Sequence, residues 1–150
     1  MFCAIIGLKR GEYMKIMAID YGDVRTGIAV SDPLEMLVGT TDVICAYTPE
    51  KAAQEIAERV KRYGAEVLVM GYPKNMDGSE GARAELYRSF AKRVEDTTGL
   101  PVVLWDERRT TVDAHRILTD NNVHGKKRKQ TVDAVAASLI LEAYLAYRKR

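Results

Sequence analysis

Three short acidic motifs, far apart in the chain, contain the residues best suited to chemistry. They are centred on Asp20, on the pair Asp106 and Glu107, and on Asp133. The first two follow apolar segments that are predicted to be strands, and Asp133 lies in a segment predicted to be a helix. Mg²⁺ and Mn²⁺ prefer such oxygen ligands and leave coordination positions open for a phosphate. If the three motifs converge in space, they predict metal-assisted phosphodiester chemistry.

The first two motifs also have ordinary structural interpretations. Asp20 precedes a glycine turn and could serve as an Asx-turn residue. Asp106 and Glu107 could form ion pairs with Arg108 and Arg109, which follow them directly. Neighbouring residues on an extended chain point to opposite sides, so both acids are not expected to hold one cation. We predict Glu107 as the metal ligand and Asp106 as a supporting residue.

Asp133 falls on the same helical arc as the small residues Ala136 and Ala137, so its carboxylate is expected to point towards the core. A buried carboxylate needs a compensating partner. The helix N-terminus could supply it, because Asp133 lies in the first turn of the predicted helix. A metal shared with Asp20 and Glu107 is the other candidate. Taken with those two residues, Asp133 is predicted to be a ligand.

Positive charge is concentrated between the second and third motifs. Residues 107–129 contain seven Lys or Arg and three acids, a net charge of +4, whereas the whole chain carries only +2. The basic run near the end of this segment is expected in a polar loop over residues 121–129. It is either a solvated surface or a contact for a polyphosphate backbone. The predicted nucleic-acid contacts are Arg25, Arg108, Lys126, Lys127, Arg128 and Lys129.

Composition and length are those of one globular domain. The chain has 150 residues, of which 47% are hydrophobic and 29% charged. Two cysteines, Cys3 and Cys45, suggest neither a disulfide framework nor a zinc site and favour a reducing cytosol. No stretch approaches the roughly 20 apolar residues that cross a bilayer, so no membrane partner is expected. We expect residues 1–13 to be an extension before a single domain over residues 14–150, with the natural start at Met14.

The order of predicted elements indicates an α/β fold. Strands are predicted over residues 15–20, 27–31, 37–46, 66–70 and 101–105. Helices are predicted over residues 49–63, 80–98, 110–118 and 131–147. Thr48 and Gly64 have the residue types expected at the two ends of the first helix. Ser79 is expected to cap the second helix, in which Leu86, Phe90 and Val94 are expected to line one side. Short turns between the first three strands imply antiparallel hairpins, and the later strands should be parallel, with helices on both faces of the sheet.

At this point the motifs resemble those of a known family. The segments Asp20-Tyr21-Gly22, Gly71-Tyr72-Pro73, Asp106-Glu107-Arg108 and Asp133-Ala134, in this order, are similar to those of the YqgF (RuvX) family of bacterial nucleases. The resemblance implies a ribonuclease H-like fold related to the RuvC resolvases, with a five-stranded mixed sheet. It also implies phosphodiester hydrolysis with two Mg²⁺ or Mn²⁺ ions.

The same resemblance implies a nucleic-acid substrate of one of two kinds. One is structured RNA, through trimming of the 5′ end of precursor 16S ribosomal RNA, and the other is branched DNA, through cleavage of Holliday junctions. RNA and DNA offer the same phosphate to the metal, so the residues do not separate them. Oligomeric state is equally undetermined by the sequence.

Two other classes of protein remain open. The turn after Asp20 also resembles the first phosphate loop of actin-like kinases and ATPases, although 150 residues cannot supply the second lobe that closes over ATP. A nucleic-acid-binding module without catalytic activity would keep the fold and the basic residues. Metal-dependent cleavage by the purified protein separates both classes from a nuclease.

Overall fold

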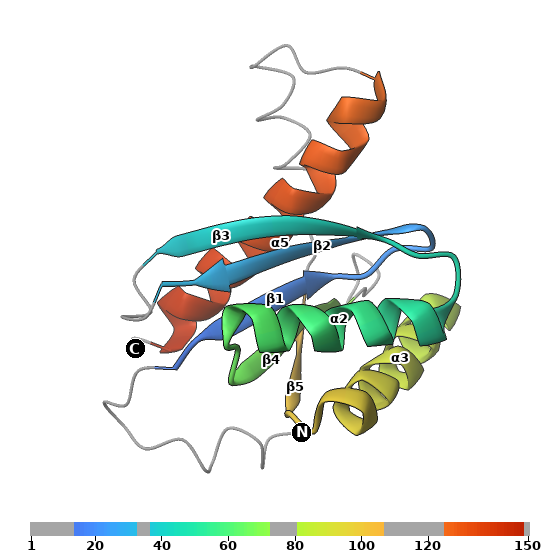
Figure 1. Ribbon diagram of the computed structural model, residues 1–150, viewed down its shortest axis with the longest axis horizontal. Coiled ribbons are helices and arrows are strands. Elements are labelled where there is room, and N and C mark those ends of the chain that lie inside the picture. Colours follow the sequence, from blue (N-terminus) through green and yellow to red (C-terminus); the bar gives the residue numbers. More distant parts are fainter. Residues whose placement is uncertain (1–13, 33–36, 73–80, 107–124, 149–150) are drawn as a thin grey trace.

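A mixed sheet of five strands forms the centre of the protein (Figure 1). The computed structural model describes residues 14–32, 37–72, 81–106 and 125–148, and for residues 125–133 it describes the backbone alone. The strand order across the sheet is β3-β2-β1-β4-β5. The strands are β1 (Ile16–Asp20), β2 (Arg25–Ser31), β3 (Val38–Cys45), β4 (Val67–Tyr72) and β5 (Val102–Asp106).

The pairing of the strands confirms the predicted mixed sheet. β1 pairs antiparallel with β2, and β2 pairs antiparallel with β3. β4 lies parallel to β1 on one side and to β5 on the other. The carboxyl ends of β1, β4 and β5 therefore meet at one edge of the sheet, which we call the carboxyl edge.

Three helices are described, namely α2 (Pro49–Tyr63), α3 (Ala82–Thr98) and α5 (Gly125–Arg148). The predicted ends of α2 are confirmed. Thr48 is the N-cap, and its side chain accepts a hydrogen bond from the backbone N–H of Lys51 at 3.2 Å. Gly64 closes the helix with a φ of 73°, a left-handed conformation that glycine adopts without steric penalty.

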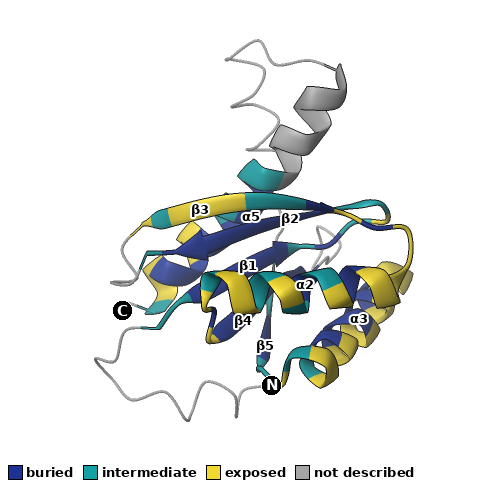
Figure 2. Ribbon diagram, viewed as in Figure 1, coloured by how far each residue is buried: buried dark blue, intermediate teal, exposed yellow. Residues whose placement is uncertain are grey.

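The helices cover both faces of the sheet, as predicted. Helices α2 and α3 lie on one face and α5 on the other (Figure 1). Along β1, Met17 and Ile19 belong to the core beneath α2 and α3, whereas Ile16 and Ala18 belong to the core beneath α5. All four are fully buried, and most of β1, β2 and β4 is coloured as buried in Figure 2. This double burial is the reason that strands of this kind are continuously apolar.

Two predictions about helices were wrong. Helix α5 begins at Gly125, so the basic run 126–129 lies in its first turns and not in a loop. Lys, Arg and Gln are good helix formers, and no breaker separates them from the predicted helix start at residue 131. Leu86 was predicted to line the buried side of α3, but it is 45% exposed, because that side is centred on Tyr87, Phe90 and Val94.

Several predictions fall outside the described residues. They are the extension over residues 1–13, the cap at Ser79 and the helix over residues 110–118. Within the described part of the chain, no helix has the length and apolar character needed to cross a membrane.

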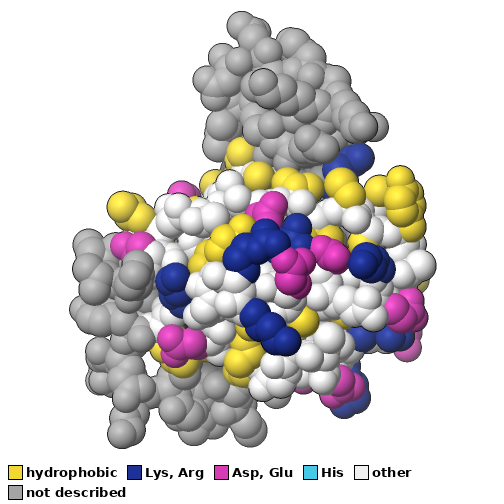
Figure 3. Space-filling model, viewed as in Figure 1, with side chains coloured by type: hydrophobic (Ala, Val, Ile, Leu, Met, Phe, Trp, Pro, Cys, Tyr) yellow, Lys and Arg dark blue, Asp and Glu magenta, His cyan; other side chains and the backbone are white. Residues whose placement is uncertain are grey.

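An ion-pair network fastens the outer strand β3 to α2. Asp42 accepts hydrogen bonds from Arg59 Nε at 3.0 Å, from the Tyr63 hydroxyl at 3.2 Å and from the backbone N–H of Val43 at 2.8 Å. Arg59 also pairs with Glu55 and Glu58 of its own helix. Charges of both signs are interspersed on this face of the molecule (Figure 3). The network therefore adds polar contacts between β3 and α2 to the buried core that both elements share.

This network should make stability depend on pH. Burial alone raises the pKa of the Asp42 carboxyl, but the hydrogen bonds from Arg59, Val43 and Tyr63 and the charge of Arg59 outweigh it, so the net pKa lies below 3.8. The stabilisation is therefore present above that value and lost as pH falls through the pKa of the folded state. At pH 7, Asp42→Asn should lower the free energy of unfolding by about 1 kcal/mol in urea denaturation.

The difference between wild type and Asp42→Asn should shrink as pH is lowered below about 4. Asp96→Asn, at an exposed position on α3, is the matched control and should have little effect at either pH. An Asp42→Asn deficit of the same size at pH 3 and pH 7 would contradict this assignment.

Candidate active site

The carboxyl edge of the sheet brings together polar residues from strands far apart in sequence. Asp20 is the last residue of β1, Tyr72 of β4 and Asp106 of β5. β4 lies between the other two strands, and Tyr72 is paired with Asp106. Ligand sites in open α/β sheets typically form at this edge, beyond the carboxyl ends of the strands. Asp20 of the first acidic motif and Asp106 of the second are thus placed at one edge.

Asp20 points to the face of the sheet that α5 covers. Side chains alternate along a strand, and Met17, Ile19 and Tyr21 all belong to the core beneath α2 and α3. Ala18, which has the opposite orientation, is buried beneath α5. Asp20, two residues after Ala18, points to the same face and is only partly buried. The first polar residue after a fully buried strand is therefore presented at the rim of the α5 face.

Asp106 points to the other face. In β5 the side chain of Trp105 packs against α5, with ring centroids 5.6 Å from Tyr144 and 5.3 Å from Tyr147. Leu104 packs on the opposite core, beneath α2 and α3. Asp106 is two residues after Leu104 and therefore points to the same side of the sheet, beneath α2 and α3. It lies at the same edge as Asp20 but on the opposite face. Its supporting role stays a prediction.

The third motif lies on the helix that crosses the Asp20 face. Asp133 is part of α5, one helical turn before Ala137, and Ala137 is buried in the same core as Ala18 of β1. The side chain of Asp133 and all of Glu107 lie outside the described residues. Among the side chains that are described, no three His, Cys, Asp or Glu residues come together as a metal site. The predicted ligand set therefore stays a prediction.

A tight turn between β1 and β2 sets the position of the chain after Asp20. A Cβ atom on Gly22 would lie 2.3 Å from the backbone oxygen of Arg25, far inside van der Waals contact. The next part of the turn is tied to the end of β3, because the Ala46 N–H donates to the Val24 oxygen at 2.8 Å. Glycine is thus required for the close approach of two backbone segments. Arg25, a predicted phosphate contact, begins β2 at the same edge.

Two arginines of α3 also reach this edge, and the sequence did not single them out. The Arg83 guanidinium lies 5.6 Å from the centroid of the Tyr87 ring, and that of Arg88 lies 5.9 Å from the centroid of Tyr72. Arg88 also donates a hydrogen bond to the Tyr72 hydroxyl. The four-residue spacing of Arg83 and Tyr87 is visible in the sequence once a helix is predicted. The contact of Arg88 with Tyr72 depends on how α3 packs on β4.

Comparison with known proteins adds three findings. The family model RuvX, described as Holliday junction resolvase, matches residues 14–147. A protein of Halothermothrix orenii named "Putative pre-16S rRNA nuclease" is 45% identical over 137 residues, which are 91% of this chain and 98% of that protein. A protein of the same name from Pelotomaculum thermopropionicum is 43% identical, over 88% of this chain and 86% of that protein.

Among solved structures, the fowlpox virus Holliday junction resolvase is similar with a TM-score of 0.56 and 13% sequence identity. The alignment covers 89% of this chain and 99% of the viral protein. At such low identity the similarity concerns the fold, which is ribonuclease H-like, as the resemblance in the sequence implied.

The Gly22 turn gives a direct test of this geometry. Gly22→Ala should lower the free energy of unfolding by about 1–3 kcal/mol, because the added carbon meets backbone and not a movable side chain. Gly39→Ala is the matched control, since a Cβ there would have its nearest neighbours at 3.5 Å, and its effect should stay within about 0.5 kcal/mol. Urea denaturation of both variants measures the difference. Equal stabilities would show that the turn has room for a side chain.

Proposed function

Because the chain belongs to the RuvX family, we propose that it is a metal-dependent nuclease that trims the 5′ end of precursor 16S ribosomal RNA. The observation that carries the catalytic part is the position of Asp20, at the carboxyl edge and on the face crossed by α5, the helix that contains Asp133. The name of the 45% identical relative supports the substrate. Such processing belongs in the cytoplasm.

Asp20, Glu107 and Asp133 would hold one or two Mg²⁺ or Mn²⁺ ions. The residues fit such ions in two respects: each offers carboxylate oxygens, and Asp20 is only partly buried, which leaves access for substrate. Glu107 follows Asp106 directly, so continued alternation would return it to the Asp20 face. When bound, a cation of this class activates a water molecule and stabilises negative charge on the leaving oxygen.

The protein's other contribution is to hold the phosphate backbone beside these carboxylates. Residues 126–129 precede Asp133 by four to seven positions on the same helix, which corresponds to about 6–10 Å along its axis. Arg25 at the start of β2 lies at the carboxyl edge, and Arg108 follows Glu107 in sequence. Such cations bind phosphates without regard to base sequence and place the scissile bond by position alone.

Cleavage of Holliday junctions is the second candidate function. It is favoured by the description of the family model and by the fold shared with the viral resolvase. Mapping the cleavage sites on a precursor rRNA and on a four-way DNA junction, under one set of conditions, would separate the two substrates. A protein that binds both and cleaves neither with any divalent metal would be a binding module.

The central test of the chemistry is Asp20→Asn. The amide keeps the shape of the side chain but removes its charge and weakens metal ligation, so cleavage should fall by about 100-fold or more while nucleic-acid binding is retained. Gel-based cleavage and binding assays with Mg²⁺, Mn²⁺ or EDTA would measure both properties. Asp96→Asn is the control and should cleave like wild type. Full activity of Asp20→Asn, or activity in EDTA, would refute the metal assignment.

Neutralising the basic run tests how substrate is held. Replacement of all four residues, Lys126, Lys127, Arg128 and Lys129, by Gln keeps helix-forming side chains and should weaken binding to every sequence. The log-log salt dependence should flatten by about one unit for each phosphate that the variant no longer neutralises. Turnover at saturating substrate should survive.

The control for this variant is Lys61→Gln/Arg62→Gln, at the far end of α2. It removes exposed positive charge away from the carboxyl edge and should leave the salt dependence unchanged. If the basic-run variant binds with the same salt slope as wild type, the run is merely a solvated helix start.

A further inference from the structure

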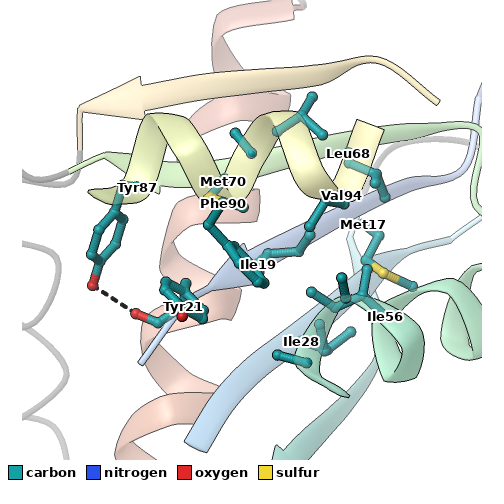
Figure 4. Close-up of a cluster of buried hydrophobic side chains, with 14 of the residues drawn as sticks. Met17, Ile19, Tyr21, Ile28, Ile56, Leu68, Met70, Tyr87, Phe90 and Val94 are labelled. Atoms are coloured by element: carbon teal, nitrogen blue, oxygen red, sulfur yellow. Dashed lines mark hydrogen bonds between the residues drawn. The ribbon is translucent and has the colours of Figure 1, made fainter. Parts of the chain in front are cut away.

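Tyr21, the residue directly after Asp20, is held more firmly than a residue in a turn requires. Its ring is stacked on Phe90 of α3, with centroids 3.7 Å apart and planes 11° apart. The Tyr87 ring meets it edge-on at 5.4 Å (Figure 4). Burial raises the pKa of Tyr21, and the charges of Asp23 and Glu50 add to that, so the phenol stays neutral.

The backbone of Tyr21 is held as well. The Tyr87 hydroxyl donates a hydrogen bond of 2.7 Å to the Tyr21 carbonyl oxygen, within the buried core (Figure 4). β1 ends at Asp20, whose pairing with Gly27 is the last of the ladder with β2. The bond from Tyr87 therefore secures a carbonyl that lies just beyond the end of the ladder. It joins residues 66 positions apart in the chain.

Tyr87 is itself oriented by a neighbour. Arg83, one turn earlier on α3, donates from Nη2 to the Tyr87 oxygen at 3.3 Å, and its guanidinium lies over the Tyr87 ring. Two hydrogen bonds in series, from Arg83 to Tyr87 and from Tyr87 to Tyr21, polarise one another. Packing alone does not need the hydroxyl, because Phe at position 87 would fill the same space.

We propose that Tyr87 is a positioning residue for the Asp20 carboxylate, acting through its hydrogen bond to the carbonyl of Tyr21. This inference rests on the proposed function of Asp20 as a metal ligand. Asp20 and Tyr21 share a peptide bond, so the ring stack and the hydrogen bond on the α3 face fix the chain direction from which Asp20 leaves towards the α5 face. A functional carboxylate must be placed within about 0.5 Å, which a free turn does not guarantee.

The test is Tyr87→Phe, with Tyr63→Phe as a matched control. Tyr63 also lies on a helix over the same face of the sheet, and its hydroxyl also donates to a strand residue, Asp42, at 3.2 Å. That bond lies at the end of α2 near Lys15, which precedes β1, and so away from the carboxyl edge. Each substitution removes one phenolic hydroxyl and the hydrogen bond that it donates, and Tyr87→Phe also removes the bond accepted from Arg83. A purely structural role predicts that both variants lose stability and nothing else.

Positioning predicts a different result for Tyr87→Phe. Direct binding of Mn²⁺ to the protein without nucleic acid should weaken by about 10-fold or more, as for other residues that orient metal ligands. The rate at saturating nucleic acid should fall at low Mn²⁺ and recover in part at high Mn²⁺, with KM for nucleic acid unchanged. Tyr63→Phe should match wild type in all three measurements. Arg83→Gln, at an exposed helix position, should show a smaller effect of the same kind.

The outcomes separate this inference from the proposed function. If wild type binds Mn²⁺ and cleaves, and Tyr87→Phe does both equally well, the positioning role is overturned while the nuclease assignment stands. If wild type does not bind Mn²⁺, or if Asp20→Asn binds it as tightly as wild type, both the positioning role and the proposed metal site fail. Should Tyr87→Phe not fold, Arg83→Gln decides the question, and unchanged Mn²⁺ affinity in that variant overturns the proposal.

Discussion

Burial of the central strands on both faces is the constraint on which the rest of this structure depends. Every side chain from Ile16 to Ile19 is fully buried, alternately beneath α5 and beneath the pair α2 and α3. A strand enclosed in this way can carry a polar group only at its ends. Asp20 is that end, and the parallel register of β4 and β5 brings Tyr72 and Asp106 to the same edge. The candidate site is thus a consequence of how the sheet is covered.

The two faces of the carboxyl edge differ in character. On the α3 face, Tyr21, Tyr87 and Phe90 form an aromatic cluster in which the one hydrogen bond drawn in Figure 4 fixes a backbone carbonyl. On the α5 face, Asp20 is partly buried and α5 carries both the basic run and Asp133. One face is suited to holding the chain rigid, and the other to binding cations and phosphates. A rigid support behind a polar site is a common way to position ligands.

The similarity to solved resolvases shows how far fold and substrate are separable. The viral resolvase shares the fold at 13% identity, whereas the bacterial relatives share 43–45% of residues and a name that refers to RNA. In this chain the arrangement of strands brings Asp20 and Asp106 to one edge of the sheet. Discrimination between an RNA end and a four-way junction must arise from surfaces beyond that edge, because the phosphate itself is the same.

Local signals in the sequence were enough to determine the order of the described strands and helices, the ends of α2 at Thr48 and Gly64, and the assignment of Asp20 to a strand end. The prediction failed at the basic run, which was expected in a polar loop. Its residues are good helix formers, and the helix begins at Gly125. The contact of Tyr87 with the Tyr21 carbonyl was beyond the reach of local signals, since it joins residues 66 positions apart. Periodicity reports which face of an element is buried, but not which atoms meet across it. Which atoms meet is decided by the packing of α3 on the sheet. The contact forms between two separate elements, and no short segment of sequence determines how those elements are placed against each other.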